Sequence, residues 1–161
     1  SDTLNLRNDI GFISYPENNK KLKSGEIIKD EIVVILNPDH PLADKEQLTA
    51  ADLEGQMIIM HEQGSYFQEM IHELLDKNNV QVSMPITFSN NEAIKKAVEG
   101  GTGIAPISKK VAAKEIESGK LKSLTLSATP LFRSFYMILH KDKYISGPLK
   151  QFIKLFNTQI S

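Results

Sequence analysis

The sequence predicts an α/β fold with a largely parallel sheet. Short apolar runs of strand character alternate along the chain with amphipathic helical stretches, and turn residues separate the two kinds of segment. This alternation is typical of strand–helix–strand units, in which the strands lie parallel and ligands bind beyond their carboxyl ends. A chain of 161 residues is long enough to form one domain, or two small lobes, around a hydrophobic core.

The first half of the chain predicts strands joined by turns and one amphipathic helix. Apolar runs bounded by turn residues place the strands at Asp9–Ser14, Glu31–Leu36, Met57–Met60 and Val82–Phe88. The basic segment 20–25 is expected to be solvated, and residues 49–53 to form one helical turn. The helix is expected over Ser65–Lys77, where Ser65 and Gln68 have the spacing of a capping box. One face of this helix is apolar and comprises Phe67, Met70, Ile71, Leu74 and Leu75.

A second helix is predicted at the centre of the chain, within residues 89–108. Ser89 and Glu92 again have capping-box spacing, and an apolar stripe follows, formed by Ala93, Ile94, Ala97 and Val98. The opposite side is expected to be solvated and carries Lys95, Lys96 and Glu99. Gly100–Gly101 ends the helix, because glycine adopts a left-handed backbone without steric cost. The apolar run 103–107 then predicts a short strand, which Pro106 restricts to an edge or a strand end.

The last third of the chain predicts two further helices and two strands. A helix over Ser108–Ser118 is closed by Gly119, and strands follow at Leu121–Leu126 and Phe135–His140. The final helix begins near Pro148, a residue suited to a first helical turn. Its inward-facing residues are expected to be Leu149, Phe152, Ile153 and Phe156.

Composition and charge exclude several classes of function. With 40% hydrophobic and 24% charged residues, the chain has the composition of an ordinary globular domain. The formal net charge of -1 gives no electrostatic reason to expect nucleic-acid binding by the chain itself. The absence of cysteine rules out disulfides and thiolate metal sites. No apolar run approaches the roughly 18 residues of a membrane span, and the start has no signal region. We therefore expect a cytoplasmic protein.

Several motifs occur together and in a particular order. The central helix is followed by Gly103-Ile104-Ala105-Pro106-Ile107. The other motifs are Asp9-Ile10-Gly11-Phe12, the segment Glu31–Ala43 with its His40-Pro41-Leu42-Ala43 turn, Asp52-Leu53-Glu54-Gly55, and the helix Pro148–Phe156. In this order the motifs resemble the effector-binding domain of LysR-type transcriptional regulators, over nearly the whole chain.

The resemblance implies a two-lobed fold similar to that of type II periplasmic binding proteins, with a small molecule bound between the lobes. Residues 1–35 and 135–161 would be the remnant of the first lobe, and residues 36–134 would form the second lobe. Family members have a DNA-binding helix-turn-helix, a linker helix and an opening strand–helix–strand ahead of the segment that begins at Asp9. These parts are missing here, so we expect a truncated chain whose first lobe is incomplete and whose DNA-binding domain is absent.

The turn 61–66 is the first candidate for ligand binding. It joins the carboxyl end of a predicted strand to a helix start, where free backbone N–H groups and the helix dipole favour a carboxylate or another small anion. The candidate contacts in this turn are His61, Gly64, Ser65 and Tyr66. The alternative is that Ser65 only caps its helix, and the sequence leaves both interpretations open.

Further candidates come from the resemblance. Ser14 ends a strand whose carboxyl end faces the interlobe cleft in the resembling domains, and a surface serine is the alternative. Asn90 and Asn91 begin the central helix, where their amides would reach the same cleft, and its apolar wall would be lined by Ala105, Pro106 and Ile107. Arg133 would pair with a carboxylate or form a plain surface salt bridge.

No catalytic or metal-binding motif accompanies these candidates. His61-Glu62 lacks the second histidine that an H-E-x-x-H metal site needs. The other histidines are scattered and expected to be solvated or structural; they are His40, His72 and His140. No G-x-S-x-G elbow presents a nucleophile, and residues 100–103 lack the lysine of a phosphate loop. We expect no cofactor, no metal, and solvated faces at the lysine pairs 20–21, 95–96 and 109–110.

Together these observations predict a small-molecule effector-sensing domain of a LysR-type, DNA-binding transcriptional regulator rather than an enzyme. The resemblance implies that an effector, such as a carboxylate, shifts the equilibrium among lobe orientations. DNA would be bound only through the missing N-terminal domain, and the full-length protein would form a homo-oligomer, a dimer or a tetramer, with no membrane partner. The apolar face of residues 65–77 is a candidate contact between copies. A solute-binding protein of a transport system and a small α/β enzyme are the alternatives.

Overall fold

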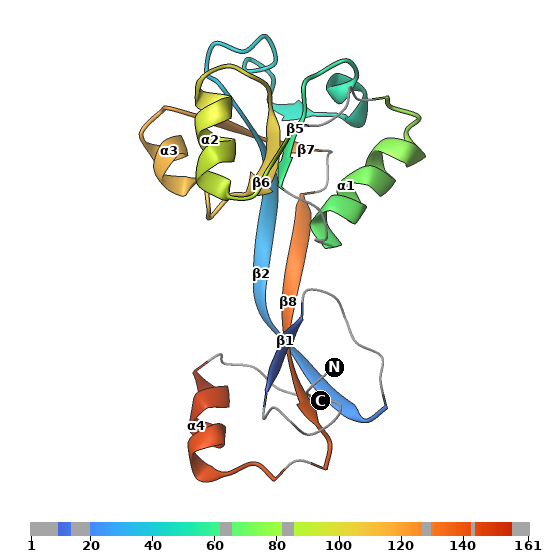
Figure 1. Cartoon of the computed structure of the whole chain (residues 1–161), viewed down its shortest axis with the longest axis vertical. Coiled ribbons are helices and arrows are strands. Elements are labelled where there is room, and N and C mark those ends of the chain that lie inside the picture. The colour runs from blue at the N-terminus through green and yellow to red at the C-terminus, as the bar shows by residue number, and fades with distance from the viewer. Residues whose placement is uncertain are drawn as a thin grey trace. The chain divides into compact units, whose positions relative to one another are not determined.

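The computed structural model describes residues 10–13, 20–61, 66–81, 86–126, 130–142 and 144–155. The chain divides into two compact units. The central unit is Asp30–Phe132, and the terminal unit combines Ser1–Lys29 with Arg133–Ser161. Two long strands, β2 (Leu22–Leu36) and β8 (Leu131–His140), contribute residues to both units (Figure 1).

Two sheets are present in the described part of the chain. The larger sheet has six strands in the order β1–β8–β2–β7–β3, with β6 also paired to β2. Its shorter strands are β1 (Gly11–Ile13), β3 (Gln47–Leu48), β6 (Ala105–Ser108) and β7 (Lys122–Leu126). The second sheet consists of the parallel strands β4 (Ile59–His61) and β5 (Ile86–Phe88).

The expectation of a largely parallel sheet is wrong, because the larger sheet is mixed. Strand β2 runs antiparallel to both β6 and β7, and β1 runs antiparallel to β8, whereas β3 runs parallel to β7. The α/β class itself is confirmed. Helix-connected strands are parallel neighbours, as β4 and β5 show. The direction of β2 relative to its partner strands depends on which distant strands pair with it. The alternation of strands and helices along the sequence does not predict that pairing.

The core of the central unit lies on both faces of β2. Successive side chains of a strand point to opposite faces, so the apolar run Ile32–Leu36 is buried throughout. One face packs in a cluster with helix α1 (Tyr66–Lys77), which contributes Ile71 and Leu75. The other face packs in a cluster with helix α2 (Asn91–Glu99), which contributes Ile94 and Val98. Figure 1 shows α1 and α2 on different sides of the strands.

The predicted strands are confirmed in position, with shifted bounds, while residues 9, 14 and 82–85 of these predictions lie outside the described residues. The largest shift is in β2, which begins at Leu22, so the expectation that residues 20–25 are solvated is wrong for Leu22 and Gly25, which are buried in that strand. Strand β8 likewise begins four residues earlier than predicted, at Leu131. The added segments, at the starts of β2 and β8, mix polar and apolar residues. Their periodicity therefore does not identify them as strands, although long strands can contain such residues.

The helix predictions are confirmed for four segments and too long for one. Helix α1, helix α2, the 3₁₀ turn η1 (Ala50–Leu53) and helix α4 (Gly147–Lys154) lie where expected. Helix α3 covers only Ala113–Glu117, because residues 109–112 form turns after β6. Gly119 does follow it in a left-handed conformation, at φ +72°. In α4, Phe152 is 41% exposed rather than inward-facing, and Phe156 lies outside the described residues.

Two helix-cap details differ from the prediction or fall outside the structure. Helix α2 is capped by Asn90, whose side chain accepts a hydrogen bond from the Ala93 N–H, so the predicted capping role of Ser89 is wrong. Asparagine and serine are both strong N-caps, and only the backbone conformation decides between neighbours. The capping box predicted for Ser65 and Gln68 lies outside the described side chains.

Candidate functional site

The carboxyl ends of β4 and β5 lie together at one edge of the central unit. Their parallel register pairs Met60 with Thr87 and His61 with Phe88. His61 is exposed at the end of β4. The chain leaves β5 at Phe88 and enters α2 three residues later, at Asn91, which brings the amino end of α2 to the same edge. This is the edge at which α/β sheets bind ligands.

The amino end of α2 offers hydrogen-bond donors at this edge. Asn90 is occupied as the cap, since its Oδ1 accepts from the Ala93 N–H at 2.8 Å. Asn91, the first helical residue, is half-buried, and its side chain makes no hydrogen bond within the described part of the chain. The N–H groups of Asn91 and Glu92 belong to the first turn, where a helix supplies no internal acceptor. Such an arrangement suits a small anion.

Two other predicted contacts lie in the core. Ala105 and Pro106 are buried in β6, where they pair with Ile35 and Val34 of β2. Pro106 also lines a small apolar cavity of about 10 Å³, with its other walls formed by Val34, Leu53, Ile58, Ile71, Leu75 and Leu126. The structure therefore shows these two residues packing against β2 and its neighbours.

The remaining predicted contacts fall outside the residues or side chains that the structure describes. Ser14, Gly64 and Ser65 lie outside the described residues, and Tyr66 begins α1 without a described side chain. Of the predicted set, the structure thus brings His61 and Asn91 to one edge, and it places Ala105 and Pro106 in the adjoining core.

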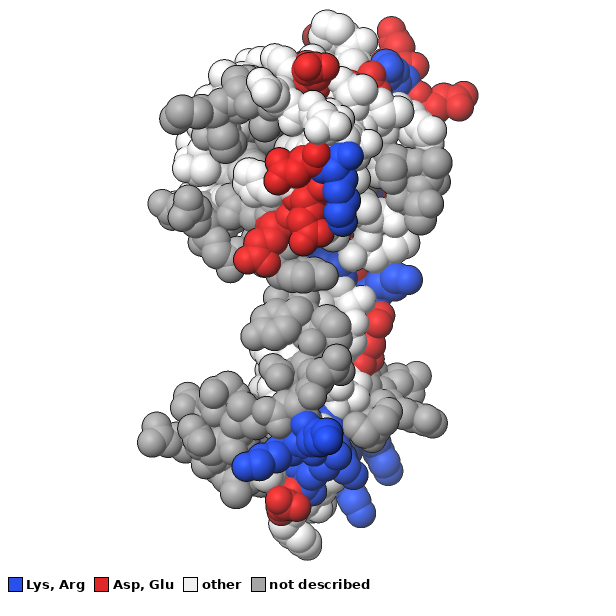
Figure 2. All heavy atoms as spheres, turned by 90° about the vertical axis from the view of Figure 1, so that its right-hand side faces the viewer, with Lys and Arg blue, Asp and Glu red and all other residues white. Residues whose placement is uncertain are grey.

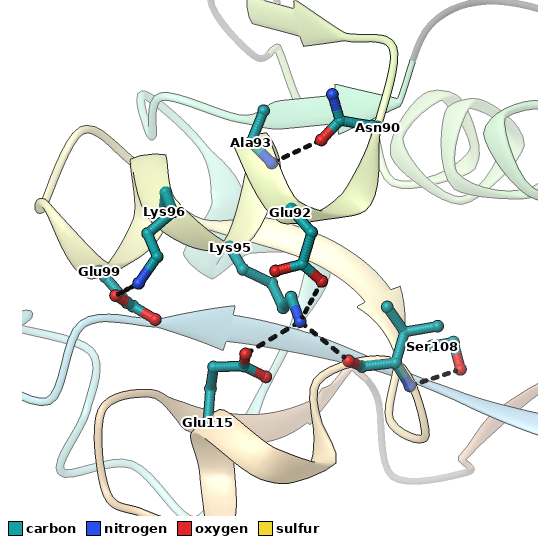
Figure 3. Close-up of polar contacts among 9 residues, drawn as sticks. Asn90, Glu92, Ala93, Lys95, Lys96, Glu99, Ser108 and Glu115 are labelled. Carbon is teal, nitrogen blue, oxygen red and sulfur yellow. Dashed lines mark hydrogen bonds and ion pairs between the residues drawn. The ribbon is translucent and has the colours of Figure 1, made fainter.

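The structure adds a polar cluster beside this edge that sequence reasoning missed. The sequence predicts that both Lys95 and Lys96 are solvated, but Lys95 is only 5% exposed. Its Nζ lies 2.8 Å from Glu92 Oε1 and 2.9 Å from Glu115 Oε1, and it donates to the Val111 carbonyl oxygen at 3.4 Å (Figure 3). The cluster therefore ties α2 to α3 and to the turn before it.

The charges in this cluster are mutually stabilised. Burial alone would lower the pKa of Lys95, but the hydrogen bonds with Glu92 and Glu115 outweigh burial and raise it. The hydrogen bond from Lys95 lowers the pKa of Glu115, against the opposing effect of its own burial. The sequence carried one signal for this cluster, the spacing of three residues between Glu92 and Lys95. No sequence pattern indicates the contact between Lys95 and Glu115, because it joins two different helices.

A second buried contact continues from the same turn to β2. The Ser108 hydroxyl donates to Asp30 Oδ1 at 2.8 Å. It also accepts from the Val111 N–H at 3.3 Å (Figure 3). Both Ser108 and Asp30 are almost completely buried. Ser108 therefore joins the end of β6 to β2 and holds the first turn that follows the strand.

The histidines outside this edge are not arranged to bind a metal ion. His140 is buried, and its Nδ1 accepts from the Asp142 N–H, while His40 Nδ1 accepts from the Leu42 N–H. His72 is exposed on α1. Among the described residues, no three His, Asp or Glu side chains are placed to hold a metal ion. In the same part of the chain, no helix has the length and apolar character needed to cross a bilayer.

The fold defines a class of protein, that of regulatory domains. The regulatory domain of CcmR from Synechocystis PCC6803, solved in complex with 2-PG, has a TM-score of 0.82 at 28% identity, covering 96% of this chain and 74% of CcmR's. The effector-binding domain of QuiR, solved with shikimate, has a TM-score of 0.77 at 24% identity, covering 96% of this chain and 73% of QuiR's, and shows the same fold.

Residues 4–161 match the family described as the LysR substrate binding domain, so the chain belongs to that family. It is 33% identical over 150 residues to the HTH-type transcriptional regulator YeiE of Escherichia coli K12, covering 93% of this chain and 51% of YeiE. The chain thus spans about half the length of the curated relatives it matches.

Family membership decides among the predicted functions. The chain is an effector-binding regulatory domain of the LysR type, not an enzyme, and its relatives are transcriptional regulators rather than solute-binding proteins of transport systems.

Proposed function

We propose that this domain senses a small carboxylate-bearing effector for a cytoplasmic, DNA-binding regulator. The observation that carries the proposal is the edge where β4 and β5 end and α2 begins. There, the exposed His61 and the Asn91 side-chain amide, which has no partner among the described residues, lie beside two first-turn N–H groups, a set of donors that matches a carboxylate. The proposed contact set remains Ser14, His61, Gly64, Ser65, Tyr66, Asn91, Ala105 and Pro106.

The wider proposal follows the family. Residues 36–134 would be the second lobe of a periplasmic-binding-protein-like fold, with 1–35 and 135–161 in the first. The effector would favour one arrangement of the lobes by binding it more tightly than the others. A homo-oligomer of full-length chains would transmit that preference to DNA through an N-terminal domain. In α1, Ile71 and Leu75 are already buried in this chain's own core, so a contact between copies there would use the exposed side of the helix.

A ligand screen tests the proposal. Thermal unfolding would be followed with 2-PG, shikimate, amino acids and aromatic acids in excess, since a ligand at a hundred times its Kd stabilises the folded state by about 2.7 kcal/mol. For any acid that raises Tm, calorimetry would give the affinity. We expect Asn91→Ala to weaken binding about tenfold, because it removes a hydrogen bond to a charged group.

Matched variants make the result specific. His61→Ala should also weaken binding, whereas His72→Ala, an exposed histidine on α1, should not. Ser65→Ala tests the turn 61–66 in the same way. If neither this chain nor the full-length regulator is stabilised by any acid in the screen, the carboxylate proposal is wrong. If an acid binds but all three site variants bind it normally, the proposed edge is wrong.

A further inference from the structure

The near-neutral net charge of the chain conceals two oppositely charged units. The terminal unit contains ten Lys and Arg against five Asp and Glu, a net charge of +5, and the central unit contains nine against fifteen, a net charge of -6. The two values add up to the -1 of the whole chain. On the face shown in Figure 2, basic side chains gather over the unit that carries α4, while acidic ones predominate over the other unit.

The terminal unit also contains a cavity that combines this basic charge with an apolar floor. The cavity has a volume of about 310 Å³ and is lined by Leu139 of β8, Lys23 of β2, and four residues of α4 and the segment before it: Ile145, Lys150, Ile153 and Lys154. This volume is at the lower end of the range of roughly 300–1,000 Å³ that is typical of small-molecule pockets. We refer to it below as the lysine pocket.

The three lysines of the lysine pocket have no acidic partner within the described part of the chain. No ion pair or side-chain hydrogen bond involves Lys23, Lys150 or Lys154 there, in contrast to Lys45, which is paired with Asp52, or Lys95. Three lysine side chains line one cavity, and an anion bound among their ammonium groups would offset the repulsion between these like charges. The floor itself is apolar, since Leu139 is 2% exposed and Ile145 and Ile153 are half-buried.

We propose that the lysine pocket is a second ligand site, which binds a small amphipathic carboxylate such as a medium-chain fatty acid or an aromatic acid. The apolar tail would lie against Leu139, Ile145 and Ile153, and the carboxylate would be held by the lysine ammonium groups at the rim. This chemistry combines burial of apolar surface with charge pairing. The site lies within the terminal unit, so it is independent of the edge formed by β4, β5 and α2 and does not rest on the function proposed above.

Octanoate is a suitable probe, with octanol as its uncharged counterpart of equal tail length. Calorimetry on the whole chain should give saturable binding of one octanoate, and octanol should bind more weakly. The affinity for octanoate should fall when the salt concentration is raised from 50 to 500 mM, because exposed charges are screened. In methyl NMR spectra, octanoate should shift the signals of Ile145 and Ile153.

Lysine variants locate the site. Lys23→Gln, Lys150→Gln and Lys154→Gln should each weaken octanoate binding about two- to fivefold, the range expected for partly exposed charge pairs. The triple variant should bind octanoate no better than octanol, and Lys→Arg at the same positions should retain binding. Lys141→Gln is the matched control, because Lys141 is an exposed lysine of the same unit outside the pocket. Circular dichroism would confirm that each variant is folded.

The proposal is overturned by any of three results. These are the absence of saturable octanoate binding to the wild-type chain, equal affinities for octanoate and octanol, or a loss of affinity in Lys141→Gln as large as in the pocket variants. The last result would show that octanoate responds only to the overall positive charge of the unit.

Discussion

At the scale of single residues, Lys95 shows how one buried cation organises the neighbourhood of the candidate site. Its ammonium group joins α2, the turn before α3, and α3 itself through Glu92, Val111 and Glu115. Glu115 depends on it in turn, since Lys95 pairs with Glu115 Oε1, while Oε2 has no partner in the described chain and the side chain is only 16% exposed. The free-energy cost of removing one member therefore includes the cost of leaving the other unpaired.

We predict that Lys95→Met lowers the free energy of unfolding by about 2 kcal/mol. The methionine keeps the apolar stem but leaves the Glu115 carboxylate without its cation. Urea unfolding at pH 7 would measure the loss. Lys77→Met is the control, because Lys77 pairs with Glu73 on the exposed surface of α1, where both side chains are solvated, and it should change stability much less. Equal losses in the two variants would contradict the role assigned to Lys95.

At the scale of elements, the 3₁₀ turn η1 depends on a carboxylate at its start. Asp52 Oδ2 accepts from both the N–H and the hydroxyl of Thr49, at 2.8 and 2.9 Å, and Asp52 Oδ1 lies 2.6 Å from Lys45 Nζ. The hydrogen bond with Lys45, followed by that with the Thr49 N–H, lowers the pKa of Asp52 from 3.8 to about 2. The turn places Leu53 in the core, so this cap supports packing as well as local structure.

A pH-dependent loss of stability follows from this cap. Because the pKa of Asp52 is lower in the folded state, its stabilisation is fully present above pH 3.8 and is lost as the pH falls toward 2. We predict that Asp52→Asn costs about 1 kcal/mol at pH 7 and progressively less below pH 4. Unfolding temperatures of the two proteins from pH 7 to pH 3 would test this. A difference that stays constant across the range would contradict it.

At the scale of the whole molecule, nearly all of the core belongs to the central unit. Both hydrophobic clusters lie within residues 30–132. The buried hydrophobic residues of the described chain that lie outside this unit are Leu22, Met137, Ile138 and Leu139. Because burial of apolar surface supplies most of the driving force of folding, the central unit has the means to fold by itself.

We predict that a chain consisting of residues 30–132 folds independently. It should unfold cooperatively in urea and give dispersed amide NMR signals, with a lower midpoint than the whole chain because β2 loses β8 as its neighbour. The whole chain, measured under the same conditions, is the reference. A broad, non-cooperative transition of the fragment would show that the terminal unit is required for the core to form.

Local sequence features predict much of the candidate site. They do not predict the buried cluster around Lys95 or the lysine pocket. The strand that ends at His61 and the helix that begins beside Asn91 are both short-range patterns, and the parallel register then puts them at one edge. Lys95 was misassigned because helical periodicity ranks residues on one helix only, while Glu115 comes from another. The lysine pocket was missed for a similar reason, because a net charge of -1 averages over two units of opposite sign.

The sequence by itself determined the α/β class, the order of strands and helices and the family resemblance, because these depend on periodicity, turn residues and motifs that are local along the chain. Only the tertiary structure decided the antiparallel pairing of β2 with β6 and β7, the burial of Lys95 between two helices, and the gathering of Lys23 with Lys150 and Lys154. Each of these features joins residues that are distant in the sequence. Such residues interact only after the chain has folded and brought them together, so no local pattern predicts the interaction.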